Sequence, residues 1–186
     1  HFSGLKMIAT NRMADEEVTF LKGKEHWVDG TSLITSLAPM NTMVGPFLRS
    51  ARTGNNLLLL DLTIAGMSGG GSPESLLTQI HAQVLFMMVM AQTVNPGVFC
   101  MHGGIPGVTE IGGDLSYSSP HQPLINGAMA RVNTWITGFP SAQSGGSTSL
   151  TDVTLQAVSE SELSRNSLRK YGVHIVRHAM GALGSL

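Results

Sequence analysis

Short apolar runs alternate with longer helical segments along this chain, and few folds are compatible with that alternation. Apolar runs typical of strands begin near residues 32, 57, 98, 141 and 173, at intervals of 25, 41, 43 and 32 residues. Each interval leaves room for a helical crossover between parallel strands. We therefore expect α/β architecture, with a parallel sheet covered by helices. Strands are expected at residues 1–3, 32–37, 57–62, 98–102, 141–143 and 173–176, and helices at 15–21, 42–52, 73–94, 121–136 and 154–170.

Two parallel architectures fit this alternation, a doubly wound sheet and a (β/α)8 barrel. The loops that follow the expected strands are long and rich in Gly, Ser and Thr, whereas the loops that precede them are short. This asymmetry favours a barrel, whose active site lies on the loops after the strands. Five or six βα units cannot close eight strands. We expect residues 1–186 to form a single partial TIM-barrel domain that is incomplete at both ends.

The low charge of the chain excludes several classes of protein. Only 12% of residues are charged and the net charge is −1, so the chain lacks the basic footprint of a nucleic-acid-binding protein. No charge occurs between Glu74 and Glu110, yet the longest apolar run there is eight residues, 84–91. A membrane span needs about 20. With one cysteine, Cys100, and no visible signal peptide, a cytoplasmic protein is expected.

Two glycine loops, at residues 69–72 and 145–148, have the composition of phosphate-binding loops that open a helix. Neither matches the P-loop or the dinucleotide-binding pattern, so tight strand-to-helix turns explain them equally well. Both interpretations remain open from the residues alone.

Histidines near the expected strand ends are the other candidates for chemistry. His174 and His178 are four residues apart, and His102 follows Cys100 on another strand, but no zinc-binding frame is present and no metal site is expected. His178 comes just after a strand, where barrel enzymes carry catalytic groups. Cys100 is expected to be a small buried hydrophobe.

Three acids stand out in neutral surroundings. Glu110 and Asp114 lie in a long uncharged loop, where they could face a cationic ligand or solvent. Asp61 interrupts a run of leucines and must be paired or neutral if it is buried. Five methionines are expected to fill the core: Met67, Met87, Met88, Met90 and Met101.

A series of motifs covers nearly the whole chain in one order. The series is A-G-M-S-G-G-G-S-P, A-Q-T-V-N-P-G, H-G-G, S-S-P-H-Q-P-L-I-N-G-A-M-A, G-F-P, S-G-G-S-T, Q-A-V-S-E and I-V-R-H-A-M-G-A-L. This ordered set resembles the trimethylamine:corrinoid methyltransferase family, including its glycine betaine-type members. The resemblance implies a (β/α)8 barrel more than twice as long as this chain.

The resemblance also implies an activity. Family enzymes move a methyl group from a methylated amine to the Co(I) of a separate corrinoid protein that docks at the barrel mouth. The expected partners are this corrinoid protein and a small methylated amine, without nucleic acid or membrane, and self-association stays open. The corrinoid belongs to the partner protein, and no cofactor is expected to be bound permanently here. A non-catalytic betaine- or corrinoid-protein-binding relative and a phosphate-binding barrel enzyme remain the alternatives.

Some members of that family carry pyrrolysine in the glycine loop before the Q-A-x-x-E segment. This position falls on Thr148, or within one residue of it. A strong cobalt nucleophile can displace a neutral tertiary amine from a quaternary ammonium ion. A free tertiary amine is a poor methyl donor and needs activation, which the pyrrolysine imine is thought to give and Thr148 cannot. We therefore expect a quaternary amine, such as a betaine, as the substrate.

The remaining site residues follow from the same resemblance. Glu110 falls where the family has an acid after the H-G-G strand, and His178 matches a family H-A-x-G segment. The chain departs from the family at Gln83 and His121, where the family often has acids. Glu110, Thr148 and His178 are the expected catalytic residues, and Met67, Gly70, His102, Gly146 and Ser147 the expected substrate-binding residues.

Overall fold

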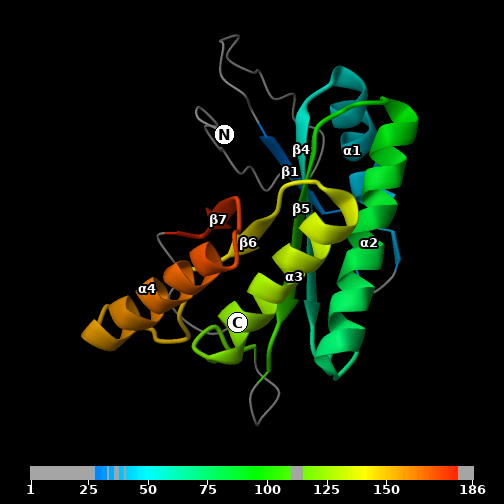
Figure 1. Ribbon diagram of the computed structural model, residues 1–186. Coiled ribbons are helices and arrows are strands. Elements are labelled where there is room, and N and C mark those ends of the chain that lie inside the picture. Colours follow the sequence, from blue (N-terminus) through cyan, green and yellow to red (C-terminus); the bar gives the residue numbers. More distant parts are fainter. Residues whose placement is uncertain (1–27, 33, 36–37, 40, 110–114, 180–186) are drawn as a thin grey trace, which may run out of the picture.

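The predicted alternation of strands and helices is confirmed in the computed structural model (Figure 1), which describes residues 28–32, 34–35, 38–39, 41–109 and 115–179. The segments expected at 1–3 and 15–21 lie outside the described residues, as do Glu110 and Asp114. The elements are β1 (Val28–Ser32), β2 (Ile34–Thr35), β3 (Ala38–Pro39), α1 (Asn41–Thr53), β4 (Asn56–Ile64), α2 (Pro73–Val94), β5 (Cys100–Gly107), α3 (His121–Thr137), β6 (Ala142–Ser144), α4 (Leu155–Lys170) and β7 (Ile175–Arg177).

The parallel strands follow one another in chain order. β1 pairs with β4 and β4 with β5, while β6 pairs with β7. A parallel bridge between His102 and Ser141 links β5 to β6. A doubly wound sheet reverses its strand order at a switch point, and the described strands contain no such reversal.

Successive helices lie side by side and cover neighbouring strands (Figure 1). α2 packs on β4 and β5, α3 on β5 and β6, and α4 contacts β7. Each of α2, α3 and α4 also contacts the helix before it. This stepwise packing places the loops that follow β5, β6 and β7 at one end of the sheet, where the parallel strands finish.

Apolar side chains from β4 pack on both faces of the sheet, as its leucine run predicts. Leu57 and Leu59 face α2, whereas Leu58 packs with Met101 and Ala142 on the face away from the helices. The buried methionines Met87, Met88 and Met101 confirm the expected role as core filler, but Met67 is 64% exposed. It lies in the turn after β4 and does not fill the core.

Helix α2 begins as the sequence predicts. Ser72 caps it by accepting a hydrogen bond from the Ser75 backbone N–H, and Pro73 occupies the first turn. Among the described residues α2 is also the one helix long and apolar enough to cross a membrane by length and composition alone. Its contacts with β4 and β5 are those of a core helix.

Several strand boundaries differ from the sequence-based expectation. The first sheet strand is Val28–Ser32, earlier than the apolar residues 32–37 indicated, because the parallel pairing with β4 selects a more polar segment. β5 runs to Gly107, into residues expected to form a loop. A Cβ on Gly103 would lie 2.8 Å from the Leu59 carbonyl oxygen, and one on Gly104 2.4 Å from Ile80. Glycine here permits close packing within a strand rather than a turn.

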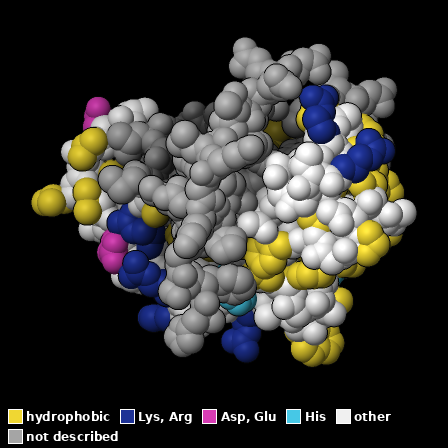
Figure 2. All heavy atoms as spheres, turned by 90° about the horizontal axis from the view of Figure 1, so that it is seen from above, with side chains coloured by type: hydrophobic (Ala, Val, Ile, Leu, Met, Phe, Trp, Pro, Cys, Tyr) yellow, Lys and Arg dark blue, Asp and Glu magenta, His cyan; other side chains and the backbone are white. Residues whose placement is uncertain are grey.

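The exposed surface carries few charges, in keeping with the composition. The face seen in Figure 2 has scattered Lys and Arg side chains between larger apolar and uncharged areas. The most exposed large apolar side chains are Leu155, Trp135, Val153, Leu163, Met67 and Val89.

Candidate functional site

The loops that follow β5, β6 and β7 meet at the carboxyl ends of these strands. Gly146, Ser147 and Thr148 are buried in the loop after β6. A Cβ on Gly146 would lie 2.6 Å from the His178 carbonyl oxygen, and the Gly146 φ of +96° is in the left-handed region. The structure therefore brings together four of the expected site residues, Gly146, Ser147, Thr148 and His178.

His178 has an unusual backbone and a defined side-chain partner. Its φ of 55° makes it the one non-glycine residue with positive φ among those described. Nδ1 lies 2.7 Å from the Ser144 hydroxyl. Burial, with the nearby charge of Arg177, lowers the pKa of His178, which favours the neutral imidazole at neutral pH. Such strain persists where the surroundings hold it, often at functional sites.

The Thr148 hydroxyl is bound to a carboxylate on α4. It donates a 2.6 Å hydrogen bond to Glu160 Oε2, and the Ser118 hydroxyl donates another to the same oxygen, also at 2.6 Å. Gln156 donates to Glu160 Oε1 at 2.8 Å. Glu160 thus connects the loop after β5, which carries Ser118, to the loop after β6.

The hydrogen bonds at this junction favour the ionised form of Glu160. The two hydroxyls each lie 2.6 Å from Glu160 Oε2, which accepts from both, and 3.2 Å from each other. The hydroxyl oxygens in turn accept backbone N–H groups, Ser149 onto Ser118 and Leu150 onto Thr148. Although partial burial raises the pKa of Glu160, the hydrogen bonds from Ser118, Thr148 and Gln156 hold it below its usual value. Glu160 is therefore ionised at neutral pH.

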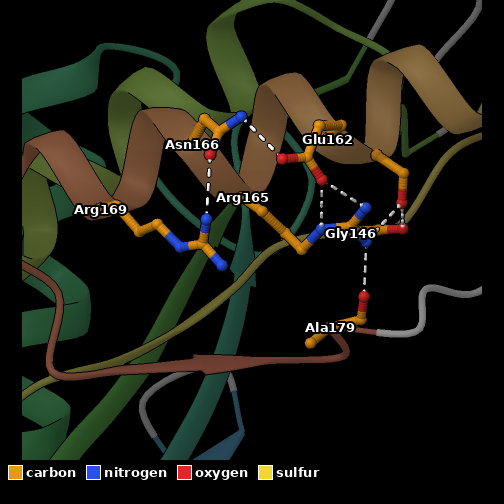
Figure 3. A network of polar contacts seen from close by, with 7 residues as sticks. Gly146, Glu162, Arg165, Asn166, Arg169 and Ala179 are labelled. Atoms are coloured by element: carbon orange, nitrogen blue, oxygen red, sulfur yellow. Dashed lines mark hydrogen bonds and ion pairs between the residues drawn. The ribbon is translucent and has the colours of Figure 1, made fainter.

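A second network on α4 connects the loop after β6 to the residues after β7 (Figure 3). The Ser161 hydroxyl donates to the Gly146 carbonyl oxygen. Arg165 donates to Ser161 at 3.2 Å and to the Ala179 carbonyl at 2.5 Å, and it pairs with Glu162 at 2.8 Å. Together, the two networks let one helix hold the loops that follow three strands.

His102 lies apart from this loop cluster. Its ring stacks on His81 of α2, with Nε2 3.4 Å from His81 Nδ1. The Gly104 N–H donates to His102 Nδ1, so the His102 proton is on Nε2 and points to His81. Burial, together with the charges of His81 and Arg177, lowers the His102 pKa to about 3. This pair is a neutral contact between β5 and α2.

Met67 and Gly70 lie in the loop between β4 and α2. A pocket of about 540 Å³ opens nearby, between the first turns of α2 and α3. Its lining is largely apolar and includes Gly66, Pro73, Leu124 and His121, which begins α3.

The two glycine loops differ in their relation to helices. Residues 69–72 lead directly into α2, whereas residues 145–148 are separated from the start of α4 by six residues, 149–154. The second loop therefore does not have the geometry of a phosphate loop that opens a helix.

Asp61 is buried between β4 and α2, as the sequence indicated. Its Oδ2 accepts hydrogen bonds of 2.8 Å from Thr63 and from Gln83, while Oδ1 has no partner. Gln83, one of the two departures from the family pattern, therefore serves to bind Asp61. Burial, which outweighs these hydrogen bonds, raises the pKa of Asp61 to about 6. The carboxyl is thus partly neutral near neutral pH.

This shift makes a prediction about stability. Because the folded state binds the Asp61 proton more tightly than the unfolded state, Asp61 should stabilise the fold less as pH rises from about 4 to about 6. The loss should be at most about 3 kcal/mol. The free energy of unfolding, measured with urea between about pH 4 and pH 6, should fall more steeply with pH for the parent protein than for Asp61→Asn. The same pH dependence of the unfolding free energy in both proteins would contradict the raised pKa of Asp61.

Two residues that contact the loops after the strands were missed by the sequence reasoning, Glu160 on α4 and Arg177 at the end of β7. Glu160 stands in the Q-A-V-S-E motif and Arg177 in I-V-R-H-A-M-G, but neither was selected. An arginine at the end of an apolar strand was the available signal for Arg177. Nothing local distinguished Glu160, because its partner Ser118 is 42 residues away. Within the described ranges, no group of three or more His, Cys, Asp or Glu side chains could hold a metal ion.

Comparisons with known proteins agree with the family resemblance that the ordered sequence motifs indicate. Residues 19–186 match the family model described as Trimethylamine methyltransferase (MTTB). The chain is 31% identical over 156 residues to a protein from Desulfitobacterium hafniense named glycine betaine methyltransferase, and the match covers 82% of this chain. It spans about a third of that relative's length, 32%. The chain belongs to the trimethylamine methyltransferase family.

Proposed function

We propose that this chain is part of a (β/α)8 barrel methyltransferase that acts on a quaternary methylated amine in the cytoplasm. The chain-order succession of parallel strands and the side-by-side helices support the barrel. On this proposal residues 1–186 supply five or six βα units of one domain. Family membership supports the activity.

The proposed reaction moves a methyl group from nitrogen to cobalt. The electron pair of the N–CH3 bond stays on nitrogen, which leaves as a neutral tertiary amine. The methyl group is accepted by the Co(I) of a corrinoid carried on a separate protein, so cobalt is a co-substrate here. The contribution of this chain is to bind and orient the amine and to favour its positive charge.

The observation that carries the proposal is the state of Thr148. Its side chain is 1% exposed, and its only proton is donated to Glu160. A threonine held in this way cannot form the covalent adduct attributed to pyrrolysine in some family members. The substrate must therefore already carry a good leaving group, which a quaternary ammonium ion provides and a free tertiary amine does not.

The other site residues have supporting roles in this proposal. Ser147, next to Thr148 in the loop after β6, and His178, just after β7, orient the rest of the substrate. Glu110, which lies outside the described residues, favours the cation. Ionised Glu160 adds a fixed negative charge to the Thr148 loop.

The substrate class can be tested with the complete protein, a corrinoid protein reduced to Co(I), and two methyl donors. Methyl-Co(III) is expected to form with glycine betaine and not with trimethylamine, as followed by the cobalt absorbance. Formation with trimethylamine would refute the argument from Thr148. Betaine binding without any methyl transfer would favour a non-catalytic relative.

A further inference from the structure

A groove of about 660 Å³, called here the α3–α4 groove, lies between the second half of α3 and the end of α4. Its lining includes two aromatic side chains, Trp135 and Tyr171, and two cations, Arg131 and Lys170. α3 starts after the loop that follows β5 and ends just before β6, so the groove lies at the end of the helices away from the candidate site. Small-molecule sites often have this volume and combine aromatic walls with a few charged groups.

The two aromatic side chains of the groove differ in how they are held. Tyr171 packs against α3, where a Cβ on Gly127 would lie 2.2 Å from its Cδ2, so the glycine makes room for the tyrosine ring. The Trp135 side chain is 87% exposed, and its indole makes no hydrogen bond or ring contact with another described residue. Tryptophan is mostly buried in folded proteins. An indole face open to solvent is a surface on which a planar ring can stack.

The two cations of the groove have no acidic partner. Within the described ranges, neither the Arg131 nor the Lys170 side chain makes an ion pair or a hydrogen bond. α3 contains no Asp or Glu, and the last acid of α4 is Glu162, about two turns before Lys170. The groove therefore has a local positive charge that no side chain of either helix neutralises.

The helix dipole explains only one of these cations. Lys170 ends α4, where a positive charge is favourable whether or not it binds anything. Arg131 lies more than one turn before the end of α3 at Thr137, beyond the reach of that effect. Arg131 and Trp135 are four residues apart on α3 and so lie on one face of the helix. The geometry therefore offers a cation and a stacking surface side by side.

We propose that the α3–α4 groove binds a planar aromatic ring joined to a phosphate monoester, of which a nucleoside monophosphate is the simplest example. The ring stacks on the Trp135 indole, and the phosphate lies between Arg131 and Lys170. A phosphate monoester carries a charge of about −1.5 to −2 at neutral pH, which matches the two unpaired cations. A nucleic-acid strand does not suit this surface, because the chain has a net charge of −1. The inference is independent of the proposed function.

The test titrates the complete protein with three probes: adenosine monophosphate (AMP), adenosine and inorganic phosphate. AMP has both the ring and the phosphate, and each of the other probes lacks one of them. Calorimetry should show that AMP binds at least about 10-fold more tightly than either adenosine or phosphate. Absence of AMP binding, or an equal affinity for AMP and adenosine, would overturn the proposal. The titration needs no methyl donor or corrinoid protein, so its outcome does not depend on the proposed reaction.

Two variants locate the binding in the groove. Trp135→Ala should weaken AMP binding about 10-fold, because the stacked ring loses its partner. Arg131→Ala should weaken AMP binding about 10-fold and adenosine binding less than about 2-fold. Both residues are exposed, so both variants should keep the melting temperature of the parent.

The matched controls are exposed residues outside the groove, Leu155→Ala on α4 and Arg52→Ala on α1. Both should bind AMP as the parent does. If the controls weaken AMP binding as much as the groove variants, or if the groove variants bind AMP normally, the ligand binds elsewhere and the assignment of the groove is wrong.

Discussion

Gly146→Ala is expected to lower the free energy of unfolding by about 3 kcal/mol and to abolish methyl transfer. The new Cβ would lie 2.6 Å from the His178 carbonyl oxygen and 3.0 Å from that of Ala179, and neither backbone atom can turn aside as a side chain would. The left-handed φ of +96° adds a cost of about 1–2 kcal/mol for any L-residue with a side chain. The loops after β6 and β7 would have to separate.

Gly172→Ala is the matched control for this variant. Gly172 has a similar left-handed φ of +74°, but nothing lies within 4 Å of the position a Cβ would take. Gly172→Ala should lower the free energy of unfolding only by the cost of the left-handed backbone, about 1–2 kcal/mol. Urea unfolding of both variants therefore isolates the contact between Gly146 and the residues after β7. Equal destabilisation of the two variants would contradict the packing described for these loops.

Glu160→Ala should reduce kcat at least about 10-fold, whereas Glu160→Gln should keep much of the activity. The Gln side-chain oxygen can still accept both hydroxyl protons, from Ser118 and Thr148, but Ala accepts neither. Glu160 acts through these two residues, and we expect it to be a positioning residue that fixes Thr148. A substrate KM that changes less than kcat in Glu160→Ala would agree with this role.

Amide hydrogen exchange tests the same role without reference to the reaction. The Ser149 and Leu150 N–H groups are bound by the Ser118 and Thr148 hydroxyl oxygens, at 2.9 and 3.2 Å. In Glu160→Ala these amides should exchange about 10- to 100-fold faster, and in Glu160→Gln much less so. Glu74→Ala, at an exposed acid on α2, serves as the control. Unchanged exchange in Glu160→Ala would exclude the positioning role.

The features that sequence predicted well are those with a local physical cause. α2 begins where the sequence predicts because the Ser72 side chain caps the helix by accepting the Ser75 N–H, and because Pro73 occupies the first turn. The burial of Asp61 among leucines predicted its need for partners, which Thr63 and Gln83 supply. Strand boundaries were less accurate, because β1 and the second half of β5 are defined by pairing with β4 rather than by their own composition.

In the candidate site, too, features with a local cause could be predicted from the sequence, whereas contacts between distant residues could not. The loop of residues 145–148 and His178 could be selected from sequence because they follow strands and match family motifs. The contacts of Glu160 with Ser118 and of Arg177 with Gly103 join residues 42 and 74 positions apart, and no local pattern announces them. His102 was selected because it stands near the end of an expected strand, but β5 continues past it and turns its ring towards α2.

A structure of the complete protein with glycine betaine bound would show where the substrate lies. We expect the ligand at the carboxyl ends of β6 and β7, with its trimethylammonium group on the side of Thr148 and His178. A ligand in the apolar pocket between α2 and α3 would contradict this expectation.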